Sequence, residues 1–335
     1  MANSSLALLS LLLLLLPLSL LLFLYLIVRP RPVKVPISNR HVFITGGSSG
    51  IGLALALQAV AEGAKVSILA RNAGKLEDAK HAILRATGCG VTAFSADVRD
   101  YDAVKRAVEE AGPIDVLVCN HGVYASKELE DQEVEEVKVM IDVNLTGTFH
   151  LIKAALPGMI SRPANRGPGS IAIMSSQAGQ VGIYGYTAYS ASKFGLRGMA
   201  EALQQEVIAH NIHVSLIFPP HTHTPALAQE MKRRPQITSK IAVSSGAFMK
   251  AEEVAKKSLN GIKCGSFSVA CNLEGFFLSI ATAGLSPQTS FLMAFVEACL
   301  AGIMRIAALC FQCNWYTIIQ KWHPGNKQHQ INTEY

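Results

Sequence analysis

The strongest constraint on the fold is an alternation of short apolar runs with longer amphipathic ones, which begins at Arg40. The apolar runs contain Val, Ile and Leu on both faces, as strands buried on both sides require. Strands of this kind that alternate with helices are typical of a parallel sheet covered by two helical layers. We therefore expect a doubly wound α/β domain over residues 37–272, with the strands HVFITG, KVSILAR, GVTAFSADV, DVLVCN, SIAIMSS, HVSLIFP and FSVACN.

A glycine-rich turn joins the first expected strand to its helix. In ITGGSSGIG, Gly46, Gly50 and Gly52 form a T-G-x-x-x-G-x-G arrangement. Glycine permits backbone angles that other residues resist and lets a pyrophosphate approach the main chain, while the helix start supplies free N–H groups. Tight turns need glycine in any case, but here strand, turn and helix follow one another in the order of a dinucleotide site. The pattern predicts a Rossmann-type fold.

The end of the second strand indicates which dinucleotide is bound. An acidic residue there would bind the ribose 2′-hydroxyl, but the chain has Ala70 and Arg71 in ILARNAGK. A guanidinium suits a 2′-phosphate through bidentate contacts, and Lys75 can assist. The alternative is a solvated loop arginine. We expect NADPH rather than NADH.

Three tyrosines lie close together in GIYGYTAYSASKFG, residues 182–195. A phenol has a pKa of about 10, which is high for proton transfer at neutral pH, and a neighbouring ammonium lowers it. Residues four apart lie on one helix face, and only Tyr189 has a lysine there, Lys193. Tyr189 is thus the candidate acid, and Tyr184 and Tyr186 are expected to line a pocket or pack under it.

TGGSSGIG together with YSASK resembles the short-chain dehydrogenase/reductase family, from about Arg40 to Asn272. The resemblance implies that Ser176 of MSSQAGQ, 13 residues before Tyr189, binds the substrate carbonyl oxygen and that Tyr189 donates a proton to it. It implies that Lys193 contacts the nicotinamide ribose, and that Asn144 of IDVNLTG holds a helix and a water. Taken singly, each match has a purely structural alternative: Ser176 as a cap at a strand end and Asn144 as a polar residue of a helix.

The same resemblance implies that an aspartate contacts adenine and that no metal is required. Asp97 of SADV matches that aspartate, although alone it reads as a turn former. The cofactor contacts expected in this way are Gly46, Ser48, Ser49, Gly50, Ile51, Gly52, Arg71, Lys75, Asp97, Val98, Asn120, Tyr189, Lys193, Thr222 and Thr224.

Two segments depart from the family pattern. The usual N-A-G is Asn120-His121-Gly122 here, and the usual P-G-x-x-x-T is PPHTHTP, which contains His221 and His223. Histidines near the cofactor can perturb nicotinamide binding or add pH sensitivity. Thr222 and Thr224 remain at the positions that the resemblance assigns to cofactor contacts, so we expect binding to survive. Three histidines also suggest a metal-binding site, but both segments already have a cofactor role, so we expect no metal.

The N-terminus predicts a membrane anchor over residues 1–36. Ser5–Val28 contains 24 residues without a charge, more than the roughly 20 needed to cross a bilayer. Arg29, Arg31 and Lys34 follow in a stiff, proline-containing linker, and by the positive-inside rule they keep the remainder cytosolic. A cleaved signal peptide is the alternative, but no small-x-small site follows the apolar run.

Residues 273–335 are expected to form an apolar, membrane-associated helical tail. Leu273–Gly284 and Ser290–Gln312 are strongly apolar, and Pro287 separates them. Glu297 and Arg305 would be costly in lipid unless they pair or snorkel. Helices that complete a dimer or domain core are an equal alternative.

Composition excludes some classes of function. The net charge of +6 is spread along the chain without a basic block interleaved with aromatics, so we expect no nucleic-acid partner. Seven scattered cysteines suit a reducing compartment, and we read the single C-x-x-C at Cys310 and Cys313 as packing. A homo-oligomer is compatible with the family, which often pairs long helices between subunits.

Within the family, the chain most resembles the 3-dehydrosphinganine (3-ketodihydrosphingosine) reductases, particularly plant-like forms. The resemblance rests on VRPRPVK, SSQAGQVGIYGYTAYSASKFGL, FPPHTHTP and CNLEGFFLS. It implies a long-chain sphingoid ketone as substrate, NADPH as cofactor, and an endoplasmic reticulum membrane with the catalytic domain cytosolic. Ala226–Lys250 would be a lid over the substrate. A membrane-bound steroid or retinoid dehydrogenase and a non-catalytic dinucleotide-binding scaffold remain alternatives.

Overall fold

A seven-stranded parallel sheet forms the centre of the molecule. The computed structural model describes residues 2–28, 31–243 and 248–331. The strand order is β3-β2-β1-β4-β5-β6-β9, every neighbouring pair is parallel, and each expected apolar run supplies one strand. The strands are β1 (His41–Thr45), β2 (Lys65–Ala70), β3 (Thr92–Ser95), β4 (Val116–Cys119), β5 (Gly169–Met174), β6 (Ile212–Phe218) and β9 (Ser268–Ala270).

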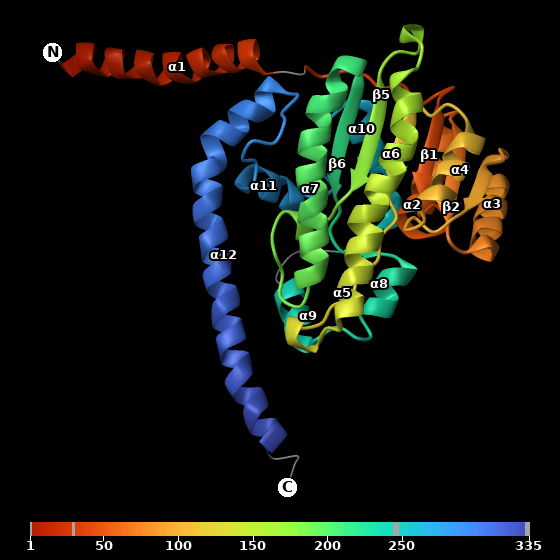
Figure 1. Ribbon diagram of the computed structural model, residues 1–335. Helices are drawn as coiled ribbons and strands as arrows, with labels where there is room; N and C mark the ends of the chain where they lie inside the picture. The colour runs from red at the N-terminus through yellow and green to blue at the C-terminus, as the bar shows by residue number, and fades with distance from the viewer. Residues whose placement is uncertain (1, 29–30, 244–247, 332–335) are drawn as a thin grey trace.

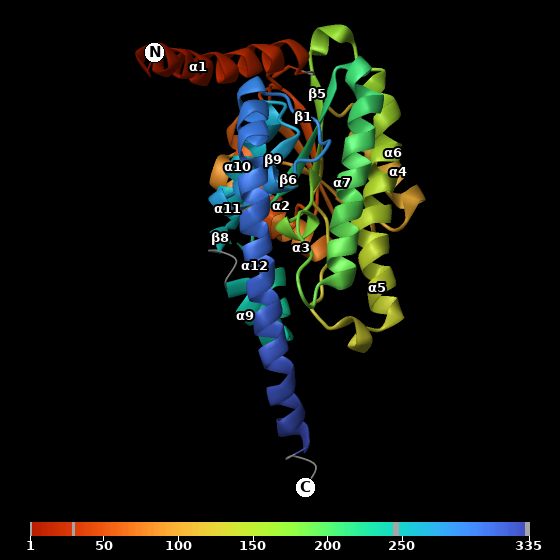
Figure 2. The same ribbon diagram turned by 90° about the vertical axis from the view of Figure 1, so that its left-hand side faces the viewer.

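Helices cover both faces of the sheet, so the predicted doubly wound fold is confirmed (Figures 1 and 2). Strand residues alternate between the two cores: Phe43 packs in one and Ile44 in the other. Because both faces are buried, the strands need apolar side chains at successive positions. One face carries α2 (Gly50–Ala61), α3 (Ala73–Thr87) and α10 (Ala251–Lys263); the other carries α4 (Tyr101–Ala111), α6 (Gly147–Ile160) and α7 (Thr187–Val207).

The helix ends follow the capping residues in the sequence. The Asn72 side chain accepts a hydrogen bond from Lys75 N at the start of α3, and Asp100 caps α4 in the same way. Gly88 ends α3 with a φ of 72°, a left-handed conformation that favours glycine. These caps fix the position of α3 directly after β2, beside the carboxyl edge of the sheet.

The connections reverse direction between β1 and β4. From β1 the chain runs outward to β2 and β3, then crosses back to β4 on the other side of β1. In open α/β sheets, such a switch point leaves a crevice at the carboxyl ends of the strands, where ligands bind. The glycine turn follows β1, and Asn120 follows β4 directly.

The segment expected to be a lid is closed at its base by two short parallel strands. These are β7 (Thr222–His223) and β8 (Met249–Lys250), and sequence reasoning missed both. Between them lie α8 (Pro225–Glu230) and α9 (Gln236–Val243). Residues 244–247 of the expected lid lie outside the described residues.

Both terminal regions form apolar helices, which are α1 (Ala2–Ile27), α11 (Leu273–Ala281) and α12 (Phe291–Ile331). The helix α12 runs along one side of the sheet domain, whereas α1 extends away from it and meets α12 near the C-terminal end of α1 (Figure 1). Among the described residues, one helical stretch is long and apolar enough to cross a membrane, Phe291–Trp322 in α12. Glu297 accepts a hydrogen bond from Gln288 Nε2 at 2.7 Å, which supplies the partner that its position in an apolar helix requires.

Candidate functional site

The glycine turn after β1 forms a groove that fits a pyrophosphate. Gly46 and Gly50 have φ values of 65° and 55°, and a Cβ on Gly52 would lie 2.2 Å from the Gly46 carbonyl oxygen. The side chain of Ser49, the N-cap residue of α2, makes no capping hydrogen bond. The first turn of α2 contains no acidic residue. The N–H groups of that turn and the positive end of the helix dipole therefore face the groove.

Most of the residues predicted to bind the cofactor line this groove. Its wall continues from the glycine turn past the end of β2 and reaches the loop after β4. Gly52 and Asp97 are the two predicted residues of this region that do not line it. Those that do are Gly46, Ser48, Ser49, Gly50, Ile51, Arg71, Lys75, Val98, Asn120 and Thr224.

Arg71 lies at the end of the groove, where the sequence placed the 2′-phosphate. Its side chain is 58% exposed, and Nη1 lies 4.0 Å from Asp97 Oδ2. Arg99, which sequence reasoning missed, binds Asp97 more tightly, with Nη2 2.7 Å from Oδ2. The pKa of Asp97 is lowered, mainly by this hydrogen bond. Arg71 keeps donors for a second anion, since Asp97 is already neutralised by Arg99.

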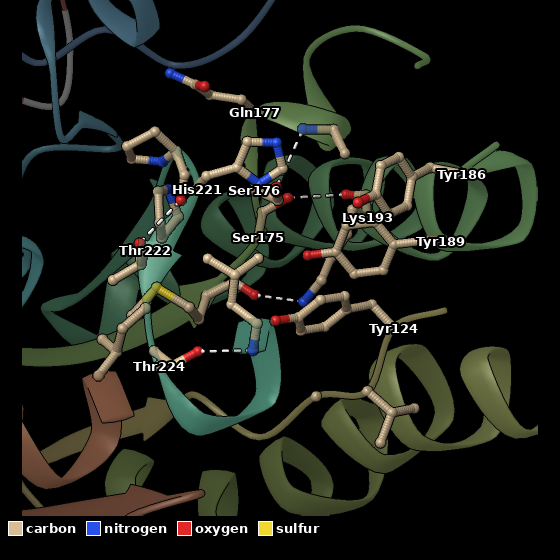
Figure 3. A pocket seen from close by; sticks show the side chains of 18 of the residues that line it. Tyr124, Ser175, Ser176, Gln177, Tyr186, Tyr189, Lys193, His221, Thr222 and Thr224 are labelled. Atoms are coloured by element: carbon tan, nitrogen blue, oxygen red, sulfur yellow. Dashed lines mark hydrogen bonds between the residues drawn. The ribbon is translucent and has the colours of Figure 1, made fainter. Parts of the chain in front are cut away.

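A second cavity adjoins the groove and contains the candidate catalytic side chains. Ile51, Asn120 and Thr224 line both spaces, so a molecule in the groove reaches the cavity. Ser176, Tyr189, Lys193 and Thr222 line the cavity (Figure 3). The residues predicted for catalysis and for the nicotinamide end of the cofactor thus lie together, at the carboxyl edge of β5 and β6.

The Tyr189 hydroxyl lies in this cavity in hydrogen-bond contact with Ser176. Burial raises the pKa of Tyr189 to about 12, although the hydrogen bond with Ser176 lowers it. The predicted lowering of this pKa by Lys193 is not observed, because burial dominates the shift and Lys193 is not among its causes. A phenol with this pKa stays protonated at neutral pH, as an acid that donates to a developing alkoxide requires.

Lys193 directs its ammonium to the backbone instead of to the phenol. Its Nζ donates to the Met174 carbonyl at 2.9 Å and lies 5.7 Å from the centre of the Tyr189 ring. Burial lowers the pKa of Lys193 to about 8. A Cβ on Gly122 would lie 3.6 Å from Nζ, so the ammonium sits where cavity and groove meet.

The two serines after β5 have different partners. Ser175 Oγ donates to the Lys193 carbonyl at 3.1 Å and so joins β5 to α7. Ser176 Oγ accepts a hydrogen bond from Ala178 N at 3.1 Å, which leaves its hydroxyl proton free to be donated. Of the two, Ser176 is the one with a donor for a ligand.

Asn144 sits in a single π-helical turn, Asp142–Thr146, between α5 (Val134–Ile141) and α6. Its side chain is fully buried, accepts from Val123 N at 2.8 Å, and donates to Val123 O and Ser192 Oγ, both at 2.9 Å. Turns of this kind are frequent at functional sites. Asn144 therefore holds the loop after β4 against α7, on either side of the cavity.

The family of the chain follows from a sequence match over this whole region. The family model described as short chain dehydrogenase matches residues 40–235. The chain belongs to the short-chain dehydrogenase family. A nicotinamide dinucleotide is the cofactor of this family, and the groove and cavity fit such a molecule.

Among curated proteins, this short-chain dehydrogenase is similar to two 3-dehydrosphinganine reductases of Arabidopsis thaliana. One is 61% identical over 300 residues, which cover 90% of each chain, and the other is 62% identical over 288 residues, which cover 86% of this chain and 88% of the relative. A 3-ketodihydrosphingosine reductase of Mus musculus is 37% identical over 289 residues, which cover 84% of this chain and 86% of the relative. A crystal structure of levodione reductase matches with a TM-score of 0.64 and 27% identity, covering 72% of this chain and 98% of that one.

The histidines that depart from the family pattern have structural partners. His121 Nδ1 lies 2.7 Å from Thr45 Oγ1, and burial lowers the pKa of His121 to about 3, so it stays neutral at physiological pH. His221 and His223 both stack on Phe248, with ring centres 5.5 and 5.3 Å apart. Among the described residues, no group of three His, Cys, Asp or Glu side chains is placed to hold a metal.

Sequence reasoning missed several side chains around the cavity. Tyr124 lines it beside Tyr186, whereas Tyr184 does not line it. Buried Glu230 of α8 accepts hydrogen bonds from Tyr186 OH at 2.8 Å and from Ser126 Oγ. A glutamate four residues before an arginine was the available signal, although Arg234 lies beyond the end of α8 and bonds Glu230 from the following turn.

Proposed function

We propose that the chain reduces 3-dehydrosphinganine to sphinganine with NADPH, as a step of sphingolipid synthesis. The observation that carries this proposal is the meeting of Ser176, Tyr189 and Lys193 in a cavity continuous with the dinucleotide groove. The substrate is proposed from the printed names of relatives that are 61% and 62% identical over most of their length.

The bound dinucleotide supplies a hydride to the substrate carbonyl carbon. Ser176 donates a hydrogen bond to the carbonyl oxygen and holds it beside the Tyr189 hydroxyl. As negative charge develops on that oxygen, Tyr189 donates its proton to it, because an alkoxide is a much stronger base than a phenolate. Lys193, whose Nζ lies 5.7 Å from the centre of the Tyr189 ring, would stabilise the phenolate that remains and would hold the ribose hydroxyls of a bound dinucleotide. Asn144 keeps the loop after β4 in place.

NADPH is proposed over NADH because of the charges at the end of β2. Arg71 and Lys75 line that part of the groove, and none of the described residues that line it is a carboxylate. The carboxylate nearest to Arg71, Asp97, is already paired with Arg99. A 2′-phosphate therefore meets two cations and no repelling charge.

We propose that the protein is bound to the endoplasmic reticulum membrane, with the catalytic body, residues 37–272, on the cytosolic side. The long apolar stretch of α12, the uncharged segment of α1 and the basic residues Arg31 and Lys34 support this placement. A substrate with a long alkyl chain partitions into the membrane, so an anchored enzyme meets it there. A homo-oligomer is compatible with this arrangement.

The test is NADPH oxidation by the detergent-solubilised protein with 3-dehydrosphinganine, steroid ketones and retinal as substrates. Turnover is expected with the sphingoid ketone and not with the others. Replacing Tyr189 by Phe removes the proton donor but keeps the ring, and should lower turnover by about 10²- to 10⁴-fold while NADPH still binds. Equal turnover in the variant would refute the acid role, and turnover of a steroid or retinal alone would refute the substrate.

A further inference from the structure

The expected lid contains a buried ion pair that the proposed reaction does not use. Glu230, the last residue of α8, pairs with Arg234, with Nη2 2.5 Å from Oε2, and the two side chains are 4% and 3% exposed. Arg234 Nε adds hydrogen bonds to both carboxylate oxygens, at 3.0 and 3.1 Å. Moving one partner away would leave a buried charge without its counter-ion, which is strongly unfavourable. The pair is therefore stable only while the chain around it stays in one arrangement.

Two segments outside the lid also bind this carboxylate. Ser126 Oγ, in the loop after β4, and Tyr186 OH, just before α7, both donate to Glu230 Oε1, the second at 2.8 Å. The backbone joins the same two segments, since Lys127 N donates to Gly185 O at 2.8 Å. Glu230 thus connects the lid to both of them. We call the four side chains the clasp: Ser126, Tyr186, Glu230 and Arg234.

Tyr186 connects the clasp to the catalytic acid. Its ring lines the cavity beside Tyr189, with the two ring centres 5.8 Å apart (Figure 3). Arg234 Cζ lies 5.9 Å from the centre of the same Tyr186 ring. A buried ring that is bonded at its hydroxyl cannot shift without moving its neighbours, because interiors are closely packed. The clasp therefore fixes one of the rings against which Tyr189 lies.

The helix α8 connects the clasp to the dinucleotide groove. Thr224, its N-cap residue, lines both the groove and the cavity, and its Oγ1 accepts a hydrogen bond from Leu227 N at 3.2 Å. Leu227 is buried and lines the cavity three residues before Glu230. Residues three apart lie on one side of a helix. The bonds of Glu230 therefore determine where Leu227 stands in the cavity.

We propose that Glu230 is a positioning residue of the proposed reductase, which fixes Tyr186 and Leu227 in the wall of the catalytic cavity. This inference rests on the proposed function. Glu230 is not among the described residues that line the cavity, so it acts through the two side chains that do. Those side chains keep the substrate ketone aligned with the Tyr189 hydroxyl. Because a small displacement of reacting groups lowers a rate strongly, loss of the clasp lowers turnover and leaves dinucleotide binding unchanged.

The experiment measures kcat and KM for 3-dehydrosphinganine, and Kd for NADPH, in Tyr186→Phe, which keeps the ring and the ion pair but removes the bond to Glu230. kcat/KM should fall by about 10-fold, the value of a hydrogen bond to a charged group, mostly through kcat. Kd for NADPH should stay as in the wild type. The matched control is Tyr184→Phe, whose hydroxyl hydrogen-bonds Glu128 outside the cavity and whose loss should change neither value. Equal losses in the two variants, or none in Tyr186→Phe, would overturn the proposal.

A double-mutant cycle separates positioning from direct contact with the substrate. Glu230→Gln keeps the shape of the side chain but removes its charge, and should lower kcat/KM by about 10- to 100-fold. Adding Tyr186→Phe to this variant should lower kcat/KM by about twofold at most, because the hydroxyl acts through Glu230. If Tyr186→Phe has its full effect in both backgrounds, the hydroxyl acts on the substrate itself and Glu230 does not position it.

Hydrogen exchange tests the clasp without any substrate. The backbone amides of α8 should exchange about tenfold faster in Tyr186→Phe and Glu230→Gln than in the wild type, while those of β5 keep their rate. Tyr186→Phe retains the ion pair, so it decides the question if the Gln variant does not fold. Unchanged exchange in α8 would refute the clasp whatever the activity. If the wild type reduces no ketone, the proposed function is refuted, and the exchange of α8 still decides whether Glu230 fixes the lid.

Discussion

At the scale of single residues, sequence spacing predicted which side chains lie together but not how their pKa values shift. Tyr189 and Lys193, four apart on α7, do line one cavity with Ser176. Burial, however, raises the pKa of the phenol and lowers that of the lysine. Desolvation depends on everything packed around a group, and this information is absent from a spacing of four residues.

Arg71 gives a prediction at this scale. Replacing Arg71 by Ala should raise the Kd for NADPH by about 10- to 100-fold, the value of hydrogen bonds to a charged group, and change that for NADH little. The reason is that only NADPH carries the 2′-phosphate. Binding of both dinucleotides is measured by titration, with Arg85→Ala in the last turn of α3 as the matched control. Equal losses for the two dinucleotides would exclude the phosphate contact.

At the scale of elements, the long periodic segments were predictable and the short ones were not. Each of the seven sheet strands overlaps one of the expected runs, and the four central strands β1, β4, β5 and β6 are buried at every position. The two-residue strands β7 and β8 are too short to show a period, and they pair only because the chain returns to the same place. The π-helical turn at Asn144 was equally invisible, since one extra residue in a turn leaves no pattern in the sequence.

The stack of His221 and His223 on Phe248 gives a prediction for the lid. Phe248→Ala removes both ring contacts, each worth about 0.5–1.5 kcal/mol in aromatic pairs, and should loosen the base of the lid. We expect a several-fold higher KM for the long-chain ketone and faster proteolysis between α8 and β8. Phe248→Tyr keeps the stack and should behave as the wild type. An unchanged KM and cleavage rate in the Ala variant would show that the stack does not hold the lid.

At the scale of the whole molecule, the order of the strands and the placement of the tail came from the structure. A list of strands does not say that β4 returns beside β1, although that reversal creates the groove. The expected apolar stretch from Ser290 to Gln312 lies, from Phe291 onward, in a longer helix, α12, whose middle is exposed. Apolar side chains such as Ile303, Ile306 and Leu309 are exposed, because the rest of the described chain does not cover them as it would cover core residues.

The cysteines test whether α12 enters a membrane. Cys299, Cys310 and Cys313 are exposed on α12, and Cys89 and Cys264 are exposed on the catalytic body. In membrane vesicles with the catalytic body outward, a membrane-impermeant maleimide should modify the two body cysteines and spare the three of α12, because lipid covers them. Detergent with mild unfolding should then expose all five to the reagent, and mass spectrometry assigns the sites. Equal labelling of all five in intact vesicles would place α12 in water.

The pairing of β7 with β8 also bears on the entropy of binding. The ladder joins the chain at residues 222–223 to residues 249–250, so the segment between them is a closed loop even before a ligand arrives. Fixing the two ends of a loop removes conformations that an open chain would lose only on binding. For the expected lid over the proposed substrate, part of the ordering cost would thus be met during folding, and more of the contact energy with the alkyl chain would remain as affinity.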